Sequence, residues 1–219
     1  MGLLRDIPVN EDCRLGLWHI VEDYDTLFRR VYMNDADIRR MEKFGSEARK
    51  VESLSVRALL QTMTTPDARI VYNESRKPFL VGGAYHISIS HSNLYTAILL
   101  GRNRKVGIDL EYMSHRIDRV ARKFIHPEEY VTSDAAWQPV HLYIHWCAKE
   151  AVYKICDKQD LNFQENIIIS PFEVSADGNG WISGRVQHGE EVSEHFSLHY
   201  EVTDNYVIVY TTKKTEENL

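Results

Sequence analysis

The chain is organised around Lys105-Val-Gly-Ile-Asp-Leu-Glu111, whose pattern is typical of a β-strand. Because strand side chains point to alternate faces, Ile108 and Leu110 share one face, and Asp109 and Glu111 share the other. Two carboxylates one pleat apart repel each other unless a cation lies between them. Their hard oxygen atoms suit Mg²⁺ or Mn²⁺ rather than Zn²⁺. Taken alone, however, an Asp-x-Glu motif more often marks an exposed edge strand with a solvated acidic face.

The composition predicts a folded protein of one large domain or two small ones. The chain has 219 residues, 43% of them hydrophobic, with a formal net charge of −6. This charge argues against a general nucleic-acid binder, and no apolar run approaches the roughly 20 residues of a membrane helix. The N-terminus lacks a signal-peptide core, and the three cysteines show no disulfide or zinc spacing. We therefore expect a soluble cytoplasmic protein that binds neither membrane nor nucleic acid.

The first half of the chain predicts one long helix and a set of strands. Apolar residues recur at three- and four-residue steps over 36–63, and Pro66 ends this pattern. A short helix is expected at 27–33, and a polar loop from Ser90 to Asn93. The strands expected in this half are 18–21, 69–72, 86–90 and 95–100.

The second half predicts a long helix over 140–158, which has two distinct faces. Ile144, Ala148, Ala151, Val152 and Ile155 share its buried side, and the other side carries Trp146, Lys149, Glu150, Tyr153, Lys154 and Asp157. An intrahelical Glu150–Lys154 pair, worth a few tenths of a kcal/mol, is the simplest account of the polar side. His141 and His145 lack a further ligand at suitable spacing, so we interpret them as ordinary surface or core histidines.

Shorter elements surround this helix. A helix over 114–123 would carry a basic outer stripe of Arg116, Arg119 and Lys123, and another helix would begin at 126–129. Residues 177–180, Asp-Gly-Asn-Gly, predict a hairpin turn. The expected strands are 167–170, 172–176, 181–186, 196–201 and 206–211.

The order of elements repeats along the chain. In each half a long helix precedes two buried strands, which suggests an α+β fold of two similar halves, each a long helix packed on a small antiparallel sheet. We place the halves at 1–108 and 109–219. The acidic strand would lie where they meet.

Three segments, taken in order, resemble the signature of the 4′-phosphopantetheinyl transferases. They are Ser88-Ile-Ser-His-Ser, Gly107-Ile-Asp-Leu-Glu and Trp146-Cys-Ala-Lys-Glu-Ala-Val-Tyr-Lys. The resemblance is to the long, monomeric, two-halved type that activates peptide synthetases and broad-range carrier proteins, rather than to the short trimeric type. It covers residues 57–154, and each motif is modest alone while the ordered set is specific.

The resemblance implies a site for coenzyme A and Mg²⁺, with Mn²⁺ a possible substitute. Asp109, Glu111 and Glu150 match the metal ligands, and Lys149 and Lys154 match lysines that hold phosphates. The positions that match the nucleotide end are Ser90, His91, Lys77 and Arg57.

The implied reaction transfers 4′-phosphopantetheine from coenzyme A to a serine of an apo carrier protein and releases adenosine 3′,5′-bisphosphate. A carboxylate near the metal would accept the serine proton, Glu150 being our first choice and Glu129, through water, the second. Lys149 would be the lysine nearer to the chemistry. The basic stripe would complement the acidic helix of a carrier protein. The sequence implies no particular carrier.

Two other functions use the same residues. A Mg²⁺-dependent nucleotide or pyrophosphate hydrolase would need no acceptor protein, so incubation with and without apo carrier separates it from a transferase. A non-catalytic carrier-protein binder is the other alternative. It is disfavoured because all three acids and both helix lysines are present.

Overall fold

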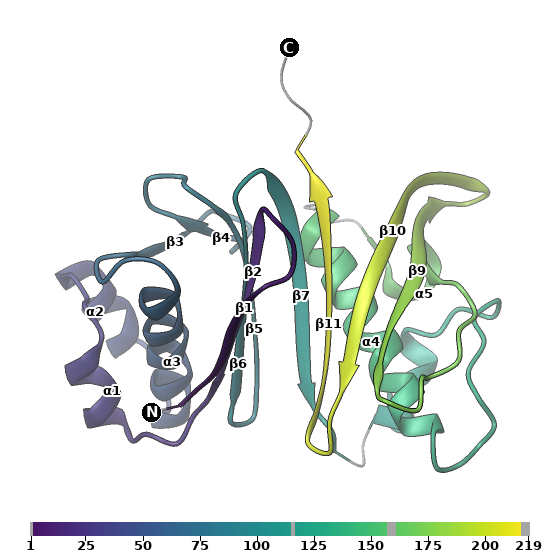
Figure 1. The fold of residues 1–219 in the computed structure, drawn as a ribbon, viewed down its shortest axis with the longest axis horizontal. Helices are drawn as coiled ribbons and strands as arrows, with labels where there is room; N and C mark the ends of the chain where they lie inside the picture. The colour runs from purple at the N-terminus through teal and green to yellow at the C-terminus, as the bar shows by residue number, and fades with distance from the viewer. Residues whose placement is uncertain (1, 115–116, 157–160, 216–219) are drawn as a thin grey trace. The chain divides into compact units, whose positions relative to one another are not determined.

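The computed structural model describes residues 2–114, 117–156 and 161–215, which form two compact units (Figure 1). The first unit runs to Lys105 and takes in the chain again from Lys214, while the second comprises Val106–Lys213. The division at residues 108 and 109 inferred from the sequence repeat stays a prediction, as does a two-fold relation between the halves.

The first unit is a four-stranded antiparallel sheet that packs against one long helix. The strand order is β1-β2-β6-β5. Trp18 of β2 and Ile98 and Leu100 of β6 belong to the apolar core that includes the α3 side chains, and every residue of β6 is buried, so β2 and β6 form the centre of the sheet. Helix α3 packs across these two strands. The strand bounds are β1 Leu3–Pro8, β2 Cys13–His19, β5 His86–Ser92 and β6 Tyr95–Gly101.

The helix predicted over 36–63 is wrong in one respect, because the structure has two helices there. α2 covers Asp35–Glu42, and α3 covers Glu47–Met63. Ser46 caps α3 by accepting a hydrogen bond from the backbone N–H of Arg49, which starts a new helix after Gly45. The short helix predicted at 27–33 is α1, Tyr24–Arg30.

Two further details of the first unit differ from the prediction. Ser90 to Ser92 belong to β5 rather than to a loop, and the turn follows at Asn93, which has φ of 53°. The strand predicted at 69–72 is β3, Ile70–Tyr72, and it pairs in a separate two-stranded ribbon with β4, Pro78–Leu80, which was not predicted.

The second unit is a five-stranded sheet with helix α4, Gln138–Cys156, against its face. Ile144, Ala148, Ala151 and Val152 of α4 are buried against apolar side chains of the sheet, as the periodicity predicted. The strand order is β7-β11-β10-β9-β8. The bounds are β7 Arg104–Tyr112, β8 Ile167–Ile169, β9 Asn179–His188, β10 Glu191–Val202 and β11 Tyr206–Lys214.

Several local predictions for the second unit are wrong. In place of a helix over 114–123 there are two 3₁₀ turns, η1 Ile117–Arg119 and η2 Ala121–Lys123; Arg116 of the basic stripe lies outside the described residues. Among the described residues, 126–129 form a turn rather than a helix and 172–176 form no strand. The turn at 177–180 leads into β9, while the β9–β10 hairpin turns at Gly189, which has φ of 62°.

The short helix α5, Phe163–Asn166, precedes β8 and was not predicted. Helix α4 is described as far as Cys156, and the predicted helix residues Asp157 and Lys158 lie outside the described part of the chain. Antiparallel sheets with few helices confirm the predicted α+β class. Within the described residues, no helix is long and apolar enough to cross a membrane.

Candidate active site

Strand β7 and helix α4 approach each other very closely at Gly107. A Cβ atom built on Gly107 would lie 2.1 Å from the backbone oxygen of Ala151. Only glycine fits there. The atom that a Cβ would meet belongs to the helix backbone, which cannot move aside as the end of a flexible side chain could. This contact sets β7 against the helix turn that carries Glu150. The acidic end of the strand, with Asp109 and Glu111, follows directly.

Asp109 and Lys154 form an ion pair across the strand and the helix. The Nζ atom of Lys154 lies 2.7 Å from Oδ1 of Asp109 and donates a second hydrogen bond to the backbone oxygen of Ile108 at 3.0 Å. Asp109 is buried, and the Lys154 side chain is 27% exposed. Burial alone would lower the pKa of Lys154, but Asp109 and Glu150 outweigh it and raise the pKa. Lys154 thus acts as an internal counter-ion for the acidic cluster.

Glu150 is the carboxylate most affected by this environment. Burial, the charge of Asp109 and the charge of Glu111 raise its pKa to about 7, although Lys154 opposes the shift. Near neutral pH the side chain can therefore either hold or release a proton. The three acids predicted from the sequence lie close enough to influence one another.

The donor set fits a hard divalent cation in its chemistry. Three interacting carboxylates are the oxygen ligands that Mg²⁺ prefers, and a cation among them would relieve their repulsion. In residues 2–114, 117–156 and 161–215, however, no three His, Cys, Asp or Glu side chains already converge as a metal site. Binding would therefore need the carboxylates to close around the ion and Lys154 to yield its place at Asp109.

Lys149 lies elsewhere, and it is the largest departure from the sequence-based description of α4. Its side chain is fully buried rather than on an open polar face. Nζ lies 2.8 Å from Oε2 of Glu129 and donates to the backbone oxygens of Phe124 and Phe163 at 2.6 and 2.9 Å. Burial lowers the pKa of Lys149 despite the charge of Glu129. The structure thus brings Lys149 and Glu129 together as a buried pair.

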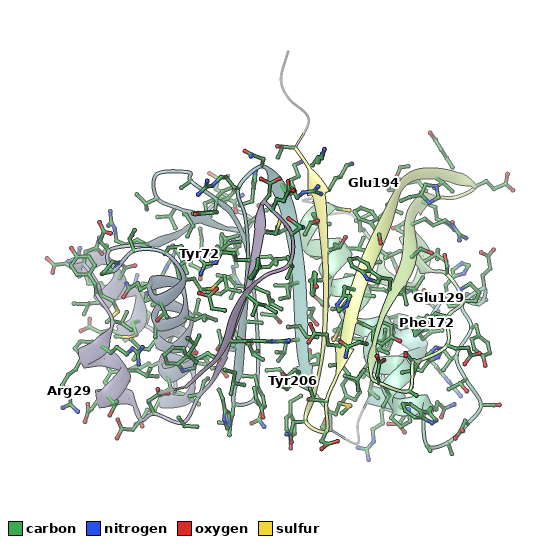
Figure 2. The ribbon with its side chains drawn as sticks, in the orientation of Figure 1. Arg29, Tyr72, Glu129, Phe172, Glu194 and Tyr206 are labelled. Carbon is green, nitrogen blue, oxygen red and sulfur yellow. The ribbon has the colours of Figure 1, made fainter. Side chains whose placement is uncertain are left out.

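Glu129 comes from the loop between η2 and α4, in the second unit (Figure 2). Its side chain has no exposed surface. The predicted phosphate role of Lys149 and proton-transfer role of Glu129 stay predictions, and both would require this pair to open. The histidines of the same helix are core residues: His141 and His145 are buried against Phe172, as one of the two interpretations expected.

The residues predicted for the nucleotide end lie in the first unit. Arg57 of α3 is buried and donates to Ser53 Oγ at 2.6 Å, and its guanidinium lies 3.4 Å from Asp37. Lys77 precedes β4 in a turn whose backbone is held by Asn73.

Ser90 and His91 are consecutive in β5, so their side chains point to opposite faces. Ser90 is buried and His91 is exposed, with its Nδ1 3.7 Å from Glu52. A ligand on one face of β5 would therefore meet one of the two side chains rather than both. The roles predicted for these first-unit residues remain predictions.

The sequence analysis missed two residues that shape the site. Gly107 was read only as part of the strand motif, although a glycine within a strand commonly marks a close backbone approach. Trp146 was placed on the polar face without a role. Its position one turn before Glu150 was the available signal, because residues four apart share a helix face. Its indole N–H donates to Oε1 of Glu111 at 3.2 Å.

The second unit is similar to known proteins. Residues 105–211 match the family described as the 4′-phosphopantetheinyl transferase superfamily. A relative, 4′-phosphopantetheinyl transferase gsp of Aneurinibacillus migulanus, is 33% identical over 112 residues, which cover 49% of this chain and 46% of the relative. The alignment thus spans about half the length of that relative. The family match almost coincides with the second compact unit, Val106–Lys213. The second unit of this chain is therefore similar over almost its whole length to the 4′-phosphopantetheinyl transferase superfamily.

Proposed function

We propose that this chain transfers 4′-phosphopantetheine from coenzyme A to a serine hydroxyl of an apo carrier protein, as a long broad-range transferase. The observation that carries the proposal is that helix α4, which bears Glu150, contacts both acids of β7: Lys154 lies 2.7 Å from Asp109, and the indole N–H of Trp146 donates to Glu111 at 3.2 Å. The match to the superfamily and the printed name of the relative support the same chemistry.

The acidic cluster would bind Mg²⁺ through Asp109, Glu111 and Glu150. When bound, the ion would supply positive charge beside the pyrophosphate of coenzyme A, where negative charge grows on the leaving group. The carboxylates fix its place, because one comes from a rigid helix and two from a strand locked to that helix at Gly107.

Lys154 is the lysine best placed to hold a phosphate. Its side chain is partly exposed and its ammonium already neutralises Asp109. With a cation held at Asp109, the Lys154 ammonium would be able to turn to a phosphate oxygen as a point charge. Lys149 has all three donors engaged in the buried pair, so we assign it a supporting role in this conformation.

Proton transfer is assigned to Glu150. The serine oxygen forms a bond to the phosphorus on the pantetheine side, the bridging P–O bond breaks, and adenosine 3′,5′-bisphosphate leaves with the bonding electrons. A carboxylate accepts the serine proton, and a pKa near 7 suits this role at neutral pH. Glu129 is the weaker candidate, because its side chain is fully buried against Lys149.

The nucleotide end of coenzyme A would use cationic and hydroxyl groups of the first unit. His91 and Lys77 are the proposed contacts for the 3′-phosphate, since His91 is exposed and Lys77 lies in a turn. Ser90 and Arg57 are buried, so they would support the binding surface from behind.

The test is mass spectrometry of several purified apo carrier proteins after incubation with this protein, coenzyme A and Mg²⁺. We expect the phosphopantetheine mass increment on a serine of at least one carrier. Asp109→Ala should abolish it while leaving the fold intact. Consumption of coenzyme A without any carrier would instead indicate a hydrolase, and coenzyme A left intact under every condition would contradict the proposal.

A further inference from the structure

Trp146 links the aromatic side of α4 to the acidic cluster. Its indole N–H donates to Glu111 Oε1 at 3.2 Å, and it precedes Glu150 by one helical turn. A carboxylate oxygen that accepts a hydrogen bond from a fixed donor has a restricted orientation. Glu111 is therefore held by a helix residue that is not itself a candidate ligand.

The Trp146 ring is held by two phenylalanine rings. Phe124 contacts it edge to face with ring centroids 5.2 Å apart, and Phe163 of α5 lies 5.6 Å away in a tilted arrangement. Such aromatic pairs contribute stability beyond that of the area they bury. Phe124 is 1% exposed, so it provides a rigid wall for the indole.

The same two phenylalanines are fastened through their backbones by the buried lysine. Lys149 donates to the carbonyl oxygens of Phe124 and Phe163, and its third bond goes to Glu129. One side chain of α4 thus ties together two segments that are 39 positions apart in the sequence. These segments carry the two rings that contact Trp146.

Glu129 extends this network to the sheet. Its Oε2 accepts from the backbone N–H of His126 at 2.7 Å, and its Oε1 accepts from the backbone N–H of Ile169 in β8 at 2.7 Å. A buried charged pair in which both oxygens and all three ammonium donors have partners is well compensated. The pair therefore has the geometry of a structural anchor.

We propose that Trp146 is a positioning residue that orients Glu111, and that the Lys149–Glu129 pair anchors the two phenylalanines that hold Trp146. This inference rests on the proposed function, because it assigns Glu111 to a metal ion. A role of Trp146 in packing alone would need only its ring, whereas the proposed role also needs the indole N–H. Groups that orient metal ligands typically change metal affinity by about 10–100-fold when they are removed.

The first experiment needs no metal. In NMR spectra of the ¹⁵N-labelled full-length protein, the indole signal of Trp146 is assigned by its loss in Trp146→Phe. We expect Glu111→Ala to move the indole proton upfield and to speed its exchange with solvent, while Glu150→Gln leaves the exchange rate unchanged. An indole signal unaffected by Glu111→Ala would overturn the proposal.

The second experiment measures Mn²⁺ binding directly by EPR of the free ion. Trp146→Phe keeps an aromatic ring but removes the donor, and we expect it to weaken Mn²⁺ binding about 10-fold or more. Tyr153→Phe is the matched control, because Tyr153 packs 5.2 Å from Phe163 in the same cluster and the substitution also removes one polar hydrogen. The control should bind Mn²⁺ like the natural protein.

The two experiments separate failure of this inference from failure of the proposed function. Mn²⁺ affinity unchanged in Trp146→Phe, in a protein that binds the ion, overturns the positioning role alone. A natural protein that binds no Mn²⁺ refutes the metal site and with it this role, whatever the indole exchange shows. If both experiments succeed, the loss of transfer in Trp146→Phe should be partly rescued by raising the Mg²⁺ concentration.

Discussion

Lys149 and Lys154 are five residues apart on one helix and have opposite surroundings. Lys149 is fully buried, pairs with Glu129 and two backbone oxygens, and has a lowered pKa. Lys154 is partly exposed, pairs with Asp109, and has a raised pKa. For Lys149 the loss of hydration dominates, whereas for Lys154 the two neighbouring carboxylates dominate.

The difference shows that one helix motif can contain both a lysine that anchors the fold and a lysine that is able to contact a ligand. A lysine that is fully dehydrated and bonded only to protein groups holds segments together, and it would lose all of these bonds if it moved. A lysine that keeps some water beside several acids can change partners when a ligand arrives. Only the second kind suits contact with a phosphate that enters and leaves during each reaction cycle.

Among the substitutions that test this difference between the two lysines, Lys149→Met should have the largest effect on stability. The change leaves Glu129 and two carbonyl oxygens buried without their cation, so we expect a loss of about 3–5 kcal/mol in the free energy of unfolding. Chemical denaturation measures it. The double variant with Glu129→Gln should recover part of the loss, because it removes the stranded charge. A Lys149→Met protein as stable as the natural one would mean that the pair is not an anchor.

Gly107→Ala should have the next largest effect on stability. It disturbs the contact between β7 and the turn of α4 that carries Glu150. The added Cβ would meet the backbone oxygen of Ala151, so the helix must shift, at a cost of about 3 kcal/mol. Gly45→Ala is the matched control, because its Cβ would meet no atom within 4 Å. Thermal melting of both variants tests the contact, and equal melting temperatures would argue against it.

His145 gives a pH test of the buried side of the helix. Burial lowers its pKa from 6.5 to about 3, so in acid the unfolded chain binds a proton that the folded chain refuses. The stability linked to the neutral form of His145 is fully present above pH 6.5. As the pH falls below this value, the free energy of unfolding decreases by up to about 1.4 kcal/mol per pH unit.

Denaturation of the natural protein and of His145→Leu between about pH 4 and 7 isolates this contribution. The stability of the variant should fall less steeply with acid than that of the natural protein. Parallel curves would place His145 in contact with water and contradict its burial.

Lys154→Met should have the smallest effect on stability, about 1 kcal/mol, because its side chain is partly exposed. Phosphopantetheinyl transfer should nevertheless fall about 100-fold or more, since a charge beside the reacting phosphate is lost. Added Mg²⁺ should raise the melting temperature of this variant more than that of the natural protein, because no ammonium competes at Asp109. A destabilisation equal to that of Lys149→Met would remove the distinction between the two lysines.

Much of the second unit could be predicted from local patterns. The alternation in β7 and the 3.6-residue periodicity of α4 are properties of each segment alone, so Asp109, Glu111 and Glu150 could be placed on the correct faces. The break between α2 and α3 was missed, because apolar periodicity continued across Gly45 and Ser46 while the cap of Ser46 began a new helix.

Burial of Lys149 could not be read from the helix pattern. The residue lies next to the apolar stripe, but its burial depends on Glu129, on two carbonyl oxygens and on the 3₁₀ turns that bring Phe124 to the helix. These are tertiary contacts between segments without a shared periodicity. The aromatic support of Trp146 was missed for the same reason, since α5 is only four residues long.

The ion pair between Lys154 and Asp109 has a consequence for how the newly synthesised chain folds. A metalloprotein whose ligands repel one another depends on its ion to complete folding, so chelators denature it. Here the chain supplies a cation of its own at Asp109, the most buried of the three clustered carboxylates. A newly made polypeptide therefore has a partner for the buried charge of Asp109 as soon as Lys154 reaches it, without an ion from solution.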